Sequence, residues 1–278
     1  MSKANGQKIG TDRDIFNSAS FITIFKRLTR LSFFMPKLSE LRAKNLELAK
    51  KAVSASVNPD NFIINAVNSV EELQKSINAL SKRLREWYSL YLPEADKRIN
   101  DNEAFVNLVI KKDKHALLRE FTVDESAGAE LREQDLRPVL SLAKLIHALA
   151  QEKQQLEEYL EKTMQEHCPN MLTLTGALIG AKLVRGAGSL KKMALMRSST
   201  IQLLGAEKAL FRHIRTGARP PKYGYLMQHV MVQGAKKQDK GKVARALADK
   251  IFLAVRVDYF RGEFIGTKLL KELKDKIK

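Results

Sequence analysis

The chemistry open to this sequence lies in a run of basic side chains between positions 176 and 222. The run holds ten Lys or Arg residues and a single acid, Glu207. Guanidinium and ammonium groups pair with phosphate oxygens, while planar or amide groups beside them can contact unpaired bases. The run ends in a stiff turn, in which Arg219 and Lys222 flank two prolines. The pattern favours contact with the backbone of a nucleic acid, and a solvated basic surface is the plain alternative.

The charge of the whole chain follows the same asymmetry. The 278 residues carry a formal net charge of +18. Residues 171–278 hold 23 Lys or Arg against 7 Asp or Glu, whereas residues 1–170 are nearly balanced at 26 against 24. Hydrophobic residues make up 44% of the chain, which is enough for a packed core and excludes wholesale disorder. The sequence therefore predicts a charge-balanced structural half, followed by a half that binds a polyanion.

Patterns for catalysis, metal binding and membrane insertion are weak. A single cysteine, Cys168, excludes an intramolecular disulfide and any zinc site with more than one thiolate. The acids of the basic half show no paired metal-ligand spacing, and His213 and His229 lack a clear nucleophile partner. No apolar run reaches the roughly 18 residues of a membrane-spanning helix. We therefore expect a binding protein without metal or cofactor; an enzyme that processes nucleic acid is the alternative from another class.

Two long heptad patterns predict the elements that must position the basic half. Apolar residues recur at steps of three and four over residues 63–91, and a second, heptad-like stretch runs over residues 139–164. Pro59 and Pro93 flank the first pattern, and the polar connection 94–137 has room for shorter helices. We expect an antiparallel coiled-coil hairpin whose free tip or flank pairs with another chain, with one ordinary helical bundle as the alternative. The predicted dimerisation residues are Leu73, Ile77, Leu80, Leu84 and Trp87.

Glycines and capping residues divide the basic half into shorter helices. The glycines between positions 176 and 188 favour close helix packing, with a phosphate-binding turn at 186–189 as the alternative. Ser198 and the two hydroxyl residues after it predict a helix start. The apolar face expected for that helix comprises Ile201, Leu204, Leu210, Phe211 and Ile214. A later amphipathic helix is expected to turn inward Val243, Leu247, Ile251, Ala254 and Val255.

The N-terminal part of the chain carries one further amphipathic pattern. After a polar stretch, a basic and apolar segment runs from Phe21 to Met35. We expect a helix that packs on the rest of the protein or on a partner, with a membrane-surface helix as the alternative. A secretory signal is disfavoured because Lys26, Arg27 and Arg30 interrupt the apolar part.

The basic half resembles the Nop domain in two motifs that stand in the expected order. The string GAEKALFR at residues 205–212 is the most specific part of a matching stretch that spans residues 176–224. The later KGKVARALADKIFLAVRVDYF, residues 240–260, is similar to the closing helices of the same domain. Upstream, residues 61–95 are similar to the coiled-coil entry of the archaeal Nop protein of box C/D small RNA–protein particles. The resemblance covers about residues 37–278.

This resemblance implies an all-α scaffold, not an enzyme, with a long antiparallel coiled-coil hairpin followed by a helical, basic Nop domain. Residues 1–55 would be the short remnant of a domain that binds the methyltransferase fibrillarin, and residues 56–168 the coiled-coil dimerisation domain. Residues 169–278 would form the Nop domain, which binds a box C/D guide RNA together with a small ribosomal-type protein that recognises its kink-turn. The particle would direct 2′-O-methylation of ribosomal RNA, in the cytoplasm of an archaeon or the nucleolus of a eukaryote. A splicing-factor relative that binds a small nuclear RNA kink-turn is the alternative.

The resemblance also carries candidate residues over, position by position. Residues 205–208 match the segment that lies against the RNA–protein composite, Arg212 ends the GAEKALFR match, and residues 222–224 match the following loop. Gln228, with His229 beside it, stands where the splicing relative stacks a histidine on an exposed base. The predicted RNA- and RNA–protein-binding residues are Gln202, Gly205, Ala206, Glu207, Lys208, Arg212, Arg215, Arg219, Lys222, Gln228 and His229.

Overall fold

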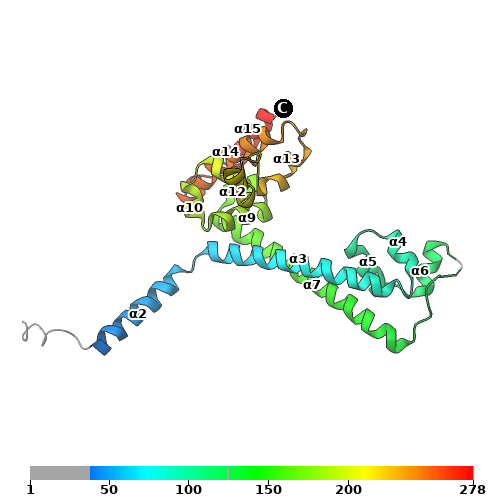
Figure 1. Ribbon diagram of the computed structural model, residues 1–278. Coiled ribbons are helices and arrows are strands. Elements are labelled where there is room, and N and C mark those ends of the chain that lie inside the picture. Colours follow the sequence, from blue (N-terminus) through cyan, green and yellow to red (C-terminus); the bar gives the residue numbers. More distant parts are fainter. Residues whose placement is uncertain (1–37, 124, 278) are drawn as a thin grey trace, which may run out of the picture. The chain divides into compact units, whose positions relative to one another are not determined.

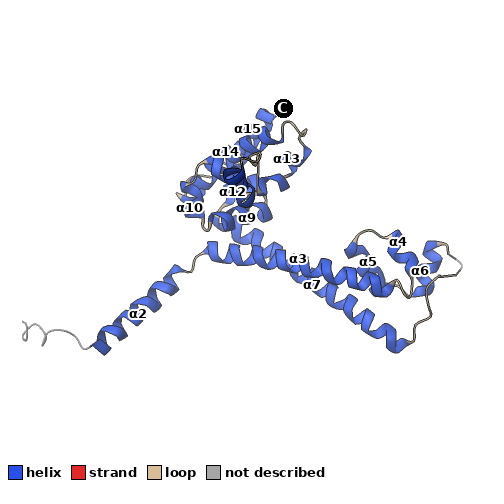
Figure 2. Ribbon diagram, viewed as in Figure 1, coloured by secondary structure: helices blue, strands red, loops and turns tan. Residues whose placement is uncertain are grey.

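The computed structural model describes residues 38–123 and 125–277. This part of the chain consists of helices joined by turns and loops, and no strand occurs within it (Figure 2). The chain divides into two compact units, residues 1–57 and residues 58–278. In the first unit, helix α2 (Leu38–Ser56) is described, and none of its residues is buried. The expected helix from Phe21 to Met35 lies outside the described residues, as do residues 1–37 of the expected fibrillarin-binding remnant.

The second unit begins with the predicted hairpin. Helices α3 (Pro59–Tyr88) and α7 (Glu133–His167) lie side by side and run in opposite directions (Figure 1). Asn58 caps α3 through its side chain, which accepts a hydrogen bond from the Asn61 backbone N–H at 3.3 Å, and Pro59 occupies the first turn. With 30 residues, α3 is about 45 Å long. The expectation of a long antiparallel hairpin is confirmed.

The hairpin is held by a heptad seam. Ile63, Val70, Ile77 and Leu84 follow one another at intervals of seven, and all four are buried. The buried residues of α7 are Val139, Ala143, Ile146, Leu160 and Met164. No residue of α7 between Ile146 and Leu160 is buried, so the middle of this helix leaves its apolar side chains partly uncovered within one chain.

Three short helices form a head at the closed end of the hairpin, within the connection where shorter helices were predicted. They are α4 (Pro93–Arg98), α5 (Asn102–Lys111) and α6 (Lys114–Phe121). Tyr88 of α3 packs edge-on against Phe105 of α5, with ring centroids 5.8 Å apart. Arg85 donates hydrogen bonds to Asp96 and to the Ile99 carbonyl, both at 2.8 Å, which ties the loop before α5 to the hairpin.

The basic half folds as a module of short helices around one long helix, α14. The short helices are α8 (Pro169–Thr175), α9 (Ala177–Ala187), α10 (Leu190–Leu195), α11 (Ser198–Leu203), α12 (Glu207–Thr216), the 3-10 helix η1 (Tyr225–Gln228), α13 (Val230–Gly234) and α15 (Gly266–Ile277). The long helix α14 (Lys240–Tyr259) buries nine residues. The five residues predicted to face inward on this helix are all among them, so that prediction is confirmed: Val243, Leu247, Ile251, Ala254 and Val255.

Two buried contacts fix the start of the module. Asp258 accepts hydrogen bonds from the backbone N–H groups of Asn170 and Met171 at 3.1 and 2.9 Å, and so caps α8. Burial raises the pKa of this carboxyl. Gly180 of α9 lies so close to α7 that an added Cβ would come within 2.6 Å of the Met164 methyl group. The glycine at 180 therefore serves close helix packing, as predicted.

Candidate nucleic-acid interface

The GAEKALFR string begins where the chain leaves the core of the module. Gly205 adopts φ +87° between α11 and α12, and its backbone N–H donates to the Glu207 carboxylate at 2.7 Å. This break divides the apolar face that was expected to continue along one helix. Leu204 before the break is buried, whereas Phe211 and Ile214 after it are 63% and 69% exposed. The left-handed turn at Gly205 redirects the chain, so Phe211 and Ile214 do not continue the buried face of α11.

Two loops that are separate in sequence are paired beneath this break. The Gly224 N–H donates to the Gln202 carbonyl at 3.1 Å, and the Tyr225 N–H donates to the Leu204 carbonyl at 2.8 Å. The buried Gln202 side chain donates to the Lys222 carbonyl at 2.5 Å. The structure thus brings the GAEKALFR segment and the basic turn together. It also assigns Gln202, predicted as a binding residue, to the scaffold of the loops.

Glycine is required on both sides of this loop pair. A Cβ at Gly224 would lie 1.9 Å from the Leu204 carbonyl oxygen, which no side chain can occupy. A Cβ at Gly205 would lie 2.8 Å from carbon atoms of the Tyr225 ring. The ring of Tyr225 therefore covers the backbone of Gly205, and the base of α12 is fixed by close approach of backbone to backbone and of backbone to ring.

Helix α12 itself presents two kinds of side chain to solvent. None of its residues is buried. The predicted Lys208, Arg212 and Arg215 are exposed, and Phe211 and Ile214 are exposed on the same helix. At its end Gly217 adopts φ +66°, and the His213 ring donates a hydrogen bond to the Ala218 carbonyl. Such a helix can contact anionic and apolar groups at the same time.

A basic cleft of about 690 Å³ opens beside the loop pair. Its lining residues include the predicted Gln202, Arg219 and Lys222 from α11 and the basic turn. Three further cations line it that were not predicted as binding residues: Lys242, Arg245 and Lys276. The cleft has one acid, Asp249, among its lining residues. Five cations against one carboxylate make this cleft suited to phosphate groups.

Of the three remaining predicted residues, Ala206 stands at the N-cap position of α12, and the other two lie on η1 and at the start of α13. Gln228 is exposed, and its side-chain oxygen accepts a hydrogen bond from Lys182 at 2.8 Å. The His229 Nε2–H donates to the Leu174 carbonyl at 2.9 Å, and Nδ1 accepts from the Met231 N–H at 3.3 Å. Both ring nitrogens of His229 therefore bind backbone groups of the chain itself, and the residue caps α13.

The described part of the chain offers no geometric support for a metal site or for a membrane-spanning helix. In residues 38–123 and 125–277, no three His, Cys, Asp or Glu residues come together in a way that could hold a metal ion. Burial raises the pKa of the Cys168 thiol. Among the described helices, none combines the length and the apolar character needed to cross a bilayer.

Comparison with known proteins decides the family. Residues 69–278 match the Nop family model, whose description reads "snoRNA binding domain, fibrillarin". The chain belongs to the Nop family. The resemblance that the GAEKALFR string and its neighbours indicate is confirmed.

Nop relatives of known name differ in how much of their length this chain covers. It is 38% identical to a NOP5 family protein of Methanocaldococcus jannaschii, over 94% of this chain and 68% of the relative. It is 38% identical to nucleolar protein 58 of Schizosaccharomyces pombe over 72% of this chain, and 34% identical to human nucleolar protein 56 over 78%. The chain spans 42% and 41% of the lengths of these two nucleolar relatives.

A solved Nop structure has the same fold. The Nop5p chain of a fibrillarin/Nop5p complex matches with a TM-score of 0.52 over 99% of this chain and 86% of the other. The sequences of the two are 22% identical, so this match speaks for the fold alone.

Replacement of Gly205 by Ala tests the close approach of Tyr225. The new side chain would need φ +87° and would displace the ring, so we expect the free energy of unfolding to fall by about 2–4 kcal/mol in urea titrations. Gly217→Ala is the matched control, because Gly217 has φ +66° but no atom within 4 Å of a Cβ. Its loss should stay near 1–2 kcal/mol. Equal losses in the two variants would contradict the role given to Tyr225.

We expect acid to destabilise the fold of the basic module, because protonation of His229 is unfavourable in the folded chain. Burial lowers the pKa of this ring below its ordinary 6.5, so the unfolded chain binds a proton that the folded chain resists. The stability that depends on neutral His229 is complete above pH 6.5 and decreases as the pH falls through that value. His229→Asn, which keeps a capping oxygen, should lose less stability than the unaltered chain between about pH 7 and pH 5. The exposed His115→Asn is the control; an unchanged pH slope in His229→Asn would contradict the prediction.

Proposed function

We propose that this chain is the scaffold of a box C/D guide RNA–protein particle. Its basic module would bind a kink-turn RNA together with the small protein that recognises the kink-turn, and the chain would position fibrillarin for 2′-O-methylation of ribosomal RNA. The main support for this proposal is that helix α12 exposes cations and large apolar side chains together, next to the basic turn that lines the cleft.

The RNA part of the proposal rests on charge. Lys208, Arg212 and Arg215 on α12 shortly precede the cleft residues Arg219 and Lys222 in the sequence. Cations in such an arrangement neutralise successive phosphates and release bound counterions, which gives affinity that depends steeply on salt. Five cations of the cleft and three of α12 are enough for a contact over several nucleotides.

The protein part rests on the apolar side chains of α12. Phe211 and Ile214 are one turn apart and 63% and 69% exposed. A helix that had evolved for phosphate alone would not need large apolar side chains in water. A composite surface of RNA and protein would cover both kinds of side chain, with the cations on phosphates and Phe211 and Ile214 on the kink-turn-binding protein.

Fibrillarin enters the proposal through the relatives. The Nop family model carries fibrillarin in its description, and the Nop5p structure with the same fold is that of a complex with fibrillarin. NOP5 and nucleolar relatives favour a guide RNA particle over the splicing-factor alternative and over an enzyme. The two eukaryotic relatives are named nucleolar proteins; a cytoplasmic location in an archaeon stays a prediction.

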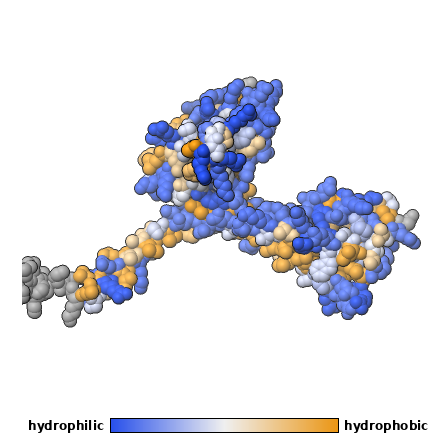
Figure 3. All heavy atoms as spheres, in the orientation of Figure 1, coloured by the Kyte–Doolittle hydropathy of each residue, from blue (hydrophilic) through white to orange (hydrophobic). Residues whose placement is uncertain are grey.

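We also propose a homodimer through the hairpin, but the five predicted dimerisation residues differ in how far they are exposed in one chain. Ile77 and Leu84 are buried within one chain, and Leu73 and Leu80 are half-buried. Trp87 is 42% exposed. Further exposed apolar side chains on the hairpin and just after α3 are Phe62, Leu90, Leu145 and Tyr159. Figure 3 shows hydrophobic side chains gathered on the hairpin near its head, whereas the face of the basic module in view is mostly hydrophilic.

Removal of two cations from α12 tests RNA–protein binding. We expect the double variant Lys208→Ala, Arg212→Ala to bind a kink-turn RNA with its bound kink-turn-binding protein at least about tenfold more weakly, because two charge-assisted contacts are lost. The slope of log affinity against log salt should decrease by about two. The matched control is Lys82→Ala, Lys144→Ala, two exposed cations of the hairpin. Filter binding with equal affinity for the α12 variant and the unaltered chain would show that another face binds.

Charges on the exposed apolar face of the hairpin test self-association. Trp87→Lys and Leu145→Lys together should convert dimers to monomers, because two cations would be buried at a two-fold interface. Sedimentation velocity measures the change, and Leu195→Lys in the basic module, where Leu195 is 72% exposed, serves as control. A dimer mass that persists in the hairpin variant would contradict the proposed interface.

A further inference from the structure

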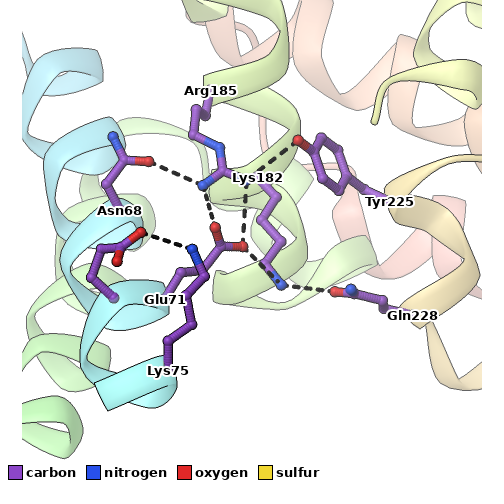
Figure 4. Close-up of polar contacts among 8 residues, drawn as sticks. Asn68, Glu71, Lys75, Lys182, Arg185, Tyr225 and Gln228 are labelled. Atoms are coloured by element: carbon purple, nitrogen blue, oxygen red, sulfur yellow. Dashed lines mark hydrogen bonds and ion pairs between the residues drawn. The ribbon is translucent and has the colours of Figure 1, made fainter. Parts of the chain in front are cut away.

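One carboxylate joins the hairpin to the basic module. Glu71 of α3 lies 2.5 Å from Arg185 Nη1 and 3.3 Å from Lys182 Nζ, both on α9 (Figure 4). The three side chains are partly shielded from water, with 30%, 22% and 15% of their surfaces exposed for Glu71, Arg185 and Lys182. An ion pair in such a position is less screened than one on an open surface. Pairing with Arg185 lowers the pKa of Glu71, and pairing with Glu71 raises the pKa of Arg185.

The two cations of α9 also reach in the opposite direction, to η1. Arg185 Nη2 donates to the Tyr225 hydroxyl at 3.3 Å, and the guanidinium carbon lies 5.6 Å from the centre of the Tyr225 ring. Lys182 donates to the side-chain oxygen of Gln228 at 2.8 Å. Figure 4 shows both cations between Glu71 on one side and Tyr225 and Gln228 on the other.

Tyr225 carries this chain of contacts to the base of α12. Its ring covers the backbone of Gly205, and its N–H binds the Leu204 carbonyl at 2.8 Å. A continuous set of contacts therefore runs from Glu71, through Arg185 and Tyr225, to the left-handed turn from which α12 starts.

The apolar core between α3 and α9 contributes to the structure in a different way from these polar contacts. Ile63, Ala66 and Val67 of α3 belong to the same hydrophobic cluster as Ala181 and Val184 of α9. This packing holds the hairpin and the module together without the ion pair, because apolar burial is not directional. Hydrogen-bonded ion pairs have fixed geometry, and so they can set how two packed elements are oriented.

We propose that Glu71 is a positioning residue for the RNA–protein-binding surface: it holds Arg185 and Lys182 so that Tyr225 fixes the turn at Gly205 and with it α12. This role rests on the proposed function for its biological meaning. Loss of the carboxylate leaves two cations close together with no acid between them. Repulsion between the two cations then favours an Arg185 side chain turned away from Lys182, which weakens its contact with the Tyr225 hydroxyl, while Arg185 Nη1 can still donate to Asn68 Oδ1 at 3.0 Å.

Hydrogen–deuterium exchange in the free chain tests the link without RNA. Glu71→Ala should raise exchange at the Gly224 and Tyr225 amides about fivefold, while the amides of α14 keep their wild-type protection. Glu71→Gln, which keeps the shape but not the charge, should fall between Glu71→Ala and wild type. Glu72→Ala is the matched control, since Glu72 is the next residue, is exposed and pairs with Lys75 on its own helix. Equal exchange at 224–225 in Glu71→Ala and Glu72→Ala would overturn the link.

Binding of a kink-turn RNA preassembled with its kink-turn-binding protein tests the positioning role. We expect Glu71→Ala to bind about fivefold more weakly than wild type, although Glu71 is assigned no contact with RNA, and Glu72→Ala to bind as wild type does. Wild-type affinity in Glu71→Ala would overturn the positioning role. If the unaltered chain does not bind this probe, the proposed function fails, while the exchange comparison still decides whether Glu71 holds the turn at Gly205.

Discussion

Backbone pairing between residues 202–204 and 222–225 is the constraint on which the proposed binding surface depends. Two main-chain hydrogen bonds join Gln202 to Gly224 and Leu204 to Tyr225, and the Gln202 side chain adds a third bond to Lys222. Gly224 must be glycine for the two backbones to come this close. The same pairing places the basic turn at the edge of the cleft. It also directs α12 away from the core, so that the helix is exposed to solvent.

Helix α12 is held at its ends, because it buries no residue along its length. An isolated helix of ten residues is marginal in water, so the stability of α12 depends on how its two ends are fixed. At the start, the Glu207 carboxylate binds the Gly205 N–H, where a negative charge also favours the helix dipole. At the end, Gly217 and the His213–Ala218 hydrogen bond close the helix. The exposed cations and apolar groups of α12 can therefore contact a partner without any change in the packing of the hydrophobic core.

Local periodicity was enough to predict the long helices, and a family motif was enough to predict that the chain belongs to the Nop family. The heptads gave the hairpin because residues such as Ile63, Val70 and Leu84 repeat along one face of a single helix. Periodicity did not predict that Phe211 is exposed, because the left-handed turn at Gly205 ends one helix and starts another. The cations Lys242 and Lys276 were missed because tertiary packing of α14 and α15 brings them to the basic turn. The polar face of α14, with Lys242 and Arg245 three residues apart, was the available signal.

We propose that α12 and the adjoining cleft contact RNA in the presence of the kink-turn-binding protein. The most direct test is photo-cross-linking of a kink-turn RNA, in complex with that protein, to the full chain, followed by mass spectrometry of the cross-linked peptides. We expect cross-links at residues 205–222 and at residues 241–245 of α14. Cross-links confined to the head of the hairpin, residues 93–121, would contradict it.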